Sequence, residues 1–167
     1  MTAPAIEAVA LAVLVAALLA AAISDIRRYV IPNRYPIAIA FAYLAYAVGQ
    51  PLNQGLMGLA AGAVAFLLCV ALFAAGIFGG GDAKLFAATA LWAGPSLAIP
   101  FVMYTVLAGG VLALAWLTPF RGLMPAAPQI PPSAEAAGPR SRFHQPTPYG
   151  AAIAAGGLCV AALRAFN

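Results

Sequence analysis

Long apolar runs, separated by short segments that carry most of the charges, constrain this sequence more than any other feature. Only 7% of the residues are charged, against roughly a quarter in an average soluble domain. Because backbone polar groups in lipid must be paired within their own segment, each run is expected to be a helix. The sequence therefore predicts an all-α integral membrane protein, a polytopic bundle of about six transmembrane helices. The runs cover residues 6–23, 36–48, 55–78, 82–93, 96–117 and 148–166.

The chain length leaves room for a single domain. Spans of roughly 20 residues each use up most of the 167 residues, so we expect residues 1–167 to form one membrane-embedded domain. Residues 118–147 contain seven prolines and are predicted to be a flexible loop. The first run is predicted to be a retained span and not a signal peptide, because Glu7 stands where such a peptide carries basic residues.

The charges predict the orientation in the membrane. Residues 36–48 and 82–93 are short, about 18 to 20 Å as helices, against a hydrocarbon core of about 30 Å. If both cross, seven of the eight basic residues lie on one side and only Arg164 on the other. The positive-inside bias makes that side the cytoplasm. The basic residues are scattered and form no face, so the lipid bilayer, and no nucleic acid, is the expected partner.

Asp25 and Asp82 are the only aspartates, and each lies where an apolar run meets a short polar turn. A carboxylate at membrane depth is costly to desolvate, which makes both functional candidates. Each also has a plainer explanation: Asp82 as the N-cap of a helix after a glycine-rich turn, and Asp25 as a surface partner of the neighbouring arginines.

Two carboxyl groups that face one water molecule can hydrolyse a peptide bond. The ionised group takes a proton from the water, and the protonated group donates to the carbonyl oxygen and later to the leaving amine. Two adjacent like charges cannot both ionise cheaply, so the pair is expected to titrate as a unit. Gly79 and Gly81 would allow a close approach of substrate to Asp82. Lys84 is either an electrostatic support for Asp82 or a basic anchor at the interface.

The remaining chemically active side chains suggest no further site. Cys69 and Cys159 lie inside apolar runs and form no Cys-x-x-Cys pair, so both are interpreted as small buried residues. His144 is a lone histidine in the proline-rich loop and is predicted to be solvent-exposed. The sequence therefore predicts no metal site.

Taken together, three motifs resemble the type IV prepilin peptidases, membrane aspartyl proteases of the Gly-x-Gly-Asp class, and among them the short form of Flp-type tight-adherence pilus systems. The motifs are spread in the expected order over nearly the whole chain. They are Asp25-x-Arg27 leading to Ile31-Pro32-Asn33, then Gly79-Gly80-Gly81-Asp82-Ala83-Lys84-Leu85, and finally Pro148-Tyr149-Gly150-x-Ala152-Ile153.

The resemblance implies an aspartyl endopeptidase of the bacterial inner membrane that removes a short leader from a prepilin on the cytoplasmic side. Asp25 and Asp82 match the two catalytic positions, and no cofactor is implied. Prepilin or pseudopilin precursors would be the substrates, with other pilus-assembly components as further candidate partners. Longer members also methylate the new amino terminus, but this chain lacks their additional cysteine-containing segment, so methyltransferase activity is not predicted.

Two other functions remain open on the sequence alone. Paired acids in a membrane also serve ion- or proton-coupled transporters, which would place them nearer the middle of the spans. Alternatively, the chain is a non-catalytic membrane subunit of a secretion or pilus assembly, in which the acids only cap helices.

Overall fold

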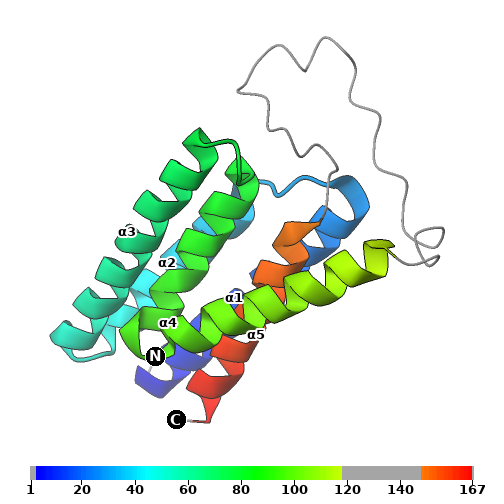
Figure 1. Cartoon of the computed structure of the whole chain (residues 1–167). Coiled ribbons are helices and arrows are strands. Elements are labelled where there is room, and N and C mark those ends of the chain that lie inside the picture. The colour runs from blue at the N-terminus through cyan, green and yellow to red at the C-terminus, as the bar shows by residue number, and fades with distance from the viewer. Residues whose placement is uncertain (1–2, 118–147, 167) are drawn as a thin grey trace.

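The computed structural model describes residues 3–117 and 148–166, which form five helices (Figure 1). In chain order they are α1 (Ala3–Arg28), α2 (Arg34–Val48), α3 (Leu52–Ala74), α4 (Gly80–Leu117) and α5 (Tyr149–Ala165). These residues include no strand, so the all-α prediction is confirmed for them. The predictions for the proline-rich loop and for His144 lie outside the described residues.

Three of the helices are long and apolar enough to cross a membrane, over Ala5–Arg28, Leu52–Ala74 and Gly80–Ala115. The helices α2 and α5 are shorter, with 15 and 17 residues. The described residues thus form five helices where the sequence predicted about six transmembrane helices. The difference arises in α4, which joins the runs 82–93 and 96–117.

The helix α4 is broken at Gly94, where the backbone angles φ 56° and ψ −172° are not helical. Figure 1 shows the chain changing direction within α4. Pro95 follows directly and has no N–H to continue the helical hydrogen bonding. Arg164, near the end of α5, donates from Nε to the Trp92 carbonyl oxygen at 2.6 Å, just before the break. The two parts of α4 therefore have different directions, and the half-buried guanidinium of Arg164 donates to a backbone carbonyl oxygen at the bend.

Replacing Gly94 with alanine is expected to destabilise the protein by about 2 kcal/mol, because a side chain is strained in this glycine-only backbone region. Thermal unfolding in detergent would measure the loss. The matched control is Gly110→Ala, also in α4, where an added Cβ meets no atom within 4 Å. Equal stabilities of the two variants would show that the bend does not depend on Gly94.

The short helix α5 packs against both α1 and α4, and most of its buried residues are small. A Cβ on Gly156 would lie 3.0 Å from the Phe101 carbonyl oxygen, and one on Gly157 would lie 2.8 Å from side-chain atoms of Leu18 and Thr89. Small residues permit this close approach of helices. Close contacts with α1 and α4 therefore bury much of this short helix. Its buried residues are Gly150, Ala152, Ile153, Ala154, Gly156, Gly157, Val160 and Ala161.

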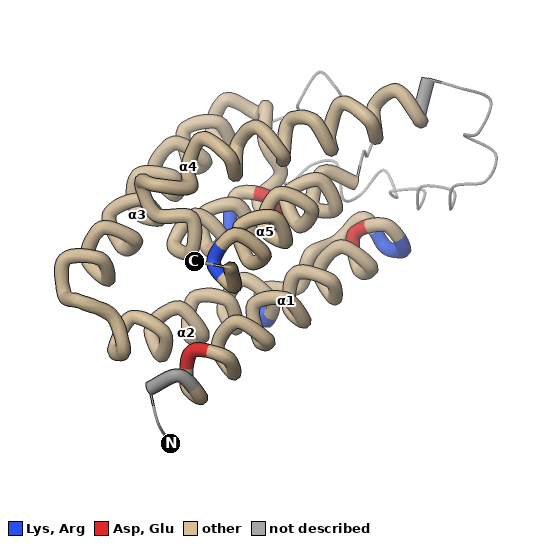
Figure 2. The backbone as a smooth tube through the Cα atoms, turned by 90° about the horizontal axis from the view of Figure 1, so that it is seen from below, with Lys and Arg blue, Asp and Glu red and all other residues tan. Residues whose placement is uncertain are grey.

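Large apolar side chains cover the outside of α3 and of the second part of α4. An apolar surface of this extent is unusual for a soluble monomer and suits contact with lipid. Figure 2 shows that the acidic and basic positions lie toward the ends of the helices, which leaves the helix middles uncharged. Apolar residues of this surface that are more than half exposed include Val64, Leu67, Leu68, Val106, Leu107 and Val111.

Candidate active site

Asp25 lies in the last turn of α1 and is 5% exposed. Its carboxyl oxygen Oδ2 accepts a hydrogen bond from the N–H of Ala151 at 3.3 Å, and the N–H of Gly150 also interacts with this carboxyl group. Arg27 and Arg28 are exposed, and no ion pair to Asp25 is found among the described residues. Asp25 is therefore a buried carboxyl group bound to backbone, and not the surface ion pair of the plainer explanation.

Asp82 is the third residue of α4 and is half-buried. The residue before the helix is Gly79, so Asp82 is not the N-cap. A Cβ on Gly79 would lie 2.8 Å from Oδ2 of Asp82, which means that the carboxyl group occupies the space that a side chain would need. The glycine predicted to admit substrate instead makes room for Asp82 itself.

The two carboxyl groups come together from α1 and α4, close enough for the charge of Asp25 to act on Asp82. Tyr29, just after α1, also interacts electrostatically with Asp25. Burial raises the pKa of the Tyr29 hydroxyl, and the negative charge of Asp25 raises it further. The two aspartates are 57 positions apart in the sequence, and the packing of the helices brings them to the same end of the bundle.

Ile31 lies between the first turn of α4, which carries Asp82, and the first turn of α5, which contacts Asp25. Its side chain is 8% exposed. A Cβ on Gly81 would lie 3.2 Å from the Cβ of Ile31, and one on Gly150 would overlap the Cδ1 of Ile31. Gly81 therefore supports the site indirectly, because its lack of a side chain lets Ile31 pack against the start of α4.

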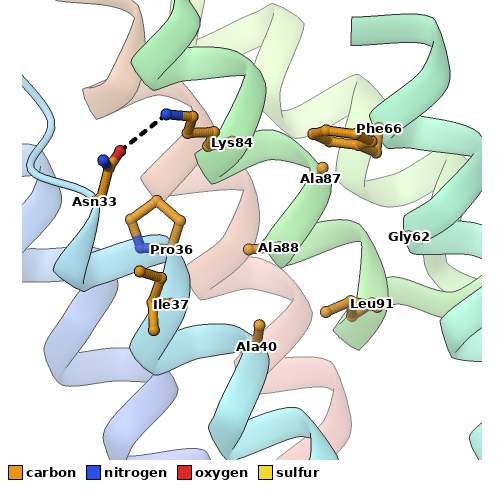
Figure 3. A pocket seen from close by; sticks show the side chains of 10 residues that line it. All are labelled: Asn33, Pro36, Ile37, Ala40, Gly62, Phe66, Lys84, Ala87, Ala88 and Leu91. Carbon is orange, nitrogen blue, oxygen red and sulfur yellow. Dashed lines mark hydrogen bonds between the residues drawn. The ribbon is translucent and has the colours of Figure 1, made fainter. Parts of the chain in front are cut away.

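Lys84 points away from the aspartates. Its Nζ donates to the Oδ1 of Asn33 at 3.0 Å, and both residues line an open groove of about 440 Å³ between α2, α3 and α4 (Figure 3). The rest of the groove is apolar, with Pro36, Phe66 and Leu91 among its walls. Of the three residues predicted to support the acids, Gly79 contacts a carboxyl group, Gly81 contacts Ile31, and Lys84 joins this separate groove.

The described residues contain no group of three histidine, cysteine, aspartate or glutamate side chains that could hold a metal ion. Cys69 is buried and Cys159 half-buried, and both are free thiols. The chemistry that the described part of the site offers is therefore that of two carboxyl groups, backbone N–H groups and water.

Sequence reasoning missed three residues of this site: Ile31, Gly150 and Ala151. Ile31 belongs to the first of the three motifs, and Gly150 and Ala151 lie within the last. The motifs alone did not indicate what any of the three residues contacts. The reason is distance along the chain, since Ala151 lies 126 positions from the carboxyl group that it contacts.

One of three comparisons with known proteins found a match. The type IV leader peptidase family matches residues 12–114, which is more than half of the chain and includes both aspartates. Searches of curated proteins and of solved structures found no significant match. The matched region ends before α5, whose first turn contacts Asp25. On the strength of the family match, the chain belongs to the type IV leader peptidase family.

Proposed function

We propose that the chain is an aspartyl endopeptidase that removes the short leader from type IV, Flp-like prepilins at the cytoplasmic face of the bacterial inner membrane. The observation that carries the proposal is a buried carboxyl group, Asp25, near enough to the half-buried Asp82 for its charge to act on it, with no ion-pair partner for either among the described residues. Two carboxyl groups held in this way are suited to acid and base catalysis, whereas surface ion pairs are not. Membership of a leader peptidase family supports the same activity.

The proposed reaction needs one ionised and one protonated carboxyl group. The ionised group takes a proton from a water molecule, whose oxygen attacks the scissile carbonyl carbon. The protonated group donates to the carbonyl oxygen, and the tetrahedral intermediate then breaks at the C–N bond as the amine is protonated. Both groups return to their starting states, so the cycle consumes one water per cleaved bond.

The proposed topology has six crossings, of which α4 contributes two, one on each side of Gly94. The first part of α4 and the helix α2 would then each cross with fewer residues than a full span, where the bilayer thins or flanking residues are recruited. Arg27, Arg28, Arg34 and Lys84 would share the cytoplasmic face with the two aspartates, in accord with the positive-inside bias.

Cysteine labelling tests this orientation. In a chain whose Cys69 and Cys159 are replaced by alanine, single cysteines are placed at Arg28, near Asp25, and at Ile77, near Asp82; both positions are exposed. We expect an impermeant reagent to reach both from the cytoplasmic side only. A third cysteine at the exposed Asn53, in the first turn of α3, should react only from the opposite side. Labelling of positions 28 and 77 from different sides would contradict the shared site.

Cleavage itself is tested with the full-length protein in proteoliposomes and a Flp-type precursor, followed by mass spectrometry of the product. The expected product lacks the leader and carries a single new amino terminus. A transporter would leave the precursor intact and take up solute with a proton gradient. That alternative is less well supported, because the acids lie in terminal turns of α1 and α4 and not in the middle of the helices.

A further inference from the structure

The helix α5 begins without a cap of its own. Pro148 precedes it and supplies no side-chain hydrogen bond to the first turn. The first N–H groups of a helix have no partner within the helix and need an external acceptor. Asp25 of α1 is such an acceptor: its Oδ2 shares the N–H of Ala151 with the Pro148 carbonyl oxygen, at 3.3 and 3.2 Å, and its carboxyl group also interacts with the N–H of Gly150. In Figure 1 the start of α5 lies beside the end of α1.

Glycine at position 150 allows this contact. A Cβ there would lie 2.9 Å from Oδ2 and 3.0 Å from Cγ of Asp25, and it would also overlap the Cδ1 of Ile31. Real Cβ atoms essentially never approach closer than 3.0 Å, so any side chain at this position would push the carboxyl group away from the N–H groups. Gly150 therefore sets where the carboxyl group of Asp25 lies.

The two aspartates differ in their surroundings. Backbone N–H donors and the positive end of a helix dipole favour the ionised form of a carboxyl group. Asp25 lies at the positive end of α5 and accepts an N–H there, although it is also in the last turn of its own helix. Asp82 lies in the first turn of α4, at the positive end of that helix, but no hydrogen-bond donor to its carboxyl group is found among the described residues. The N–H donors are therefore what distinguishes the two acids. The titratable groups that interact with Asp25 are Asp82 of α4 and Tyr29 after α1, while α5 faces it with backbone N–H groups.

We propose that the first turn of α5 holds Asp25 as the ionised member of the pair, so that Asp25 is the proton acceptor and Asp82 the proton donor, with Gly150 as a positioning residue. This assignment rests on the proposed peptidase function. Asp25 takes the proton of the attacking water while Asp82 protonates the carbonyl oxygen. When the C–N bond breaks, Asp25 passes its proton to the amine, and Asp82 recovers one from a hydroxyl of the intermediate.

The test is Gly150→Ala in the full-length enzyme, with kcat and KM measured against pH on a prepilin precursor. Displacing Asp25 from its donors makes the ionised form less favourable. The acid limb of the pH profile, where the acceptor becomes protonated, should therefore move to higher pH by about one unit. We expect kcat at neutral pH to fall about tenfold or more, with KM within about threefold of the wild-type value. Gly110→Ala is the matched control and should leave the profile unchanged, because its Cβ meets no atom within 4 Å.

A second variant separates the contact with Asp25 from the contact with Ile31. Ile31→Val removes the Cδ1 atom that a Cβ at position 150 would overlap. The double variant with Gly150→Ala should keep the shifted acid limb, because the clash with Asp25 remains. A lower kcat without a shift of the acid limb, in either variant, would overturn the assignment. If Asp25→Asn is inactive but Gly150→Ala keeps the wild-type profile, only this inference fails; if Asp25→Asn still cleaves, the proposed function fails.

Discussion

Replacing Asp25 or Asp82 with asparagine is expected to abolish precursor cleavage, lowering kcat by about 10²- to 10⁴-fold for each variant. Asparagine has nearly the shape of aspartate, and its side-chain oxygen can still accept the N–H of Ala151. The variant at position 25 therefore removes the ionisable group while it keeps the contact with α5. Each loss should be nearly complete by itself, since the two groups act in the same steps. The measurement is the rate of leader removal at equal amounts of folded protein in the membrane.

The matched control is Glu7→Gln, another change from carboxylate to amide in α1. Glu7 lies toward the other end of that helix and accepts a hydrogen bond from Gln50 at 2.9 Å. Its variant should retain the wild-type cleavage rate. Processing at wild-type rate in either aspartate variant would instead favour a non-catalytic subunit whose acids only bind helix ends.

Replacing Gly58 with alanine is expected to destabilise the protein by about 3 kcal/mol, at the upper end of the usual overpacking cost. The added Cβ would lie 2.7 Å from the carbonyl oxygen of Leu91 and 2.6 Å from the Cζ of Tyr43. The first neighbour is backbone and cannot rotate away. The second belongs to a buried tyrosine whose hydroxyl donates to the Gly55 carbonyl oxygen at 2.9 Å. Denaturant or thermal unfolding in detergent measures the loss.

Gly55→Ala in the same helix is the control for Gly58→Ala. Its Cβ would lie 3.5 Å from the Cβ of Ala47, an ordinary van der Waals contact. Because alanine favours a helix over glycine by up to about 1 kcal/mol, this variant should be as stable as the wild type or more so. Equal losses at the two positions would show that the close approach of α3 and α4 does not depend on Gly58.

The helices could be predicted from the sequence because lipid leaves the backbone little choice. Apolar runs in a chain with few charges must pair their own backbone groups, and each described run is helical. The Gly58-x-x-x-Gly62 spacing in α3 is typical of a close helix contact, and in the structure both glycines lie against Leu91 of α4. The number of helices differed because α4 comprises two helical parts that follow each other directly across the break at Gly94, with no loop between them.

Both aspartates could be singled out from the sequence, because a carboxyl group beside an apolar run is rare and costly. Their immediate surroundings could not be predicted. Gly79 and Gly81 were expected to admit substrate, whereas in the structure they make room for Asp82 and Ile31. Lys84 lies two residues after Asp82, and residues two apart do not share a helix face. Lys84 therefore contacts Asn33 and not Asp82.

The sequence by itself determined the fold class and the two candidate acids, since both follow from the cost of placing polar groups in an apolar chain. That cost acts on each residue separately and can be seen in local composition. Only the tertiary structure brings the two acids near enough to interact through their charges and places the first turn of α5 against one of them. Those contacts join residues far apart in the chain, and they depend on how closely small residues let the helices pack.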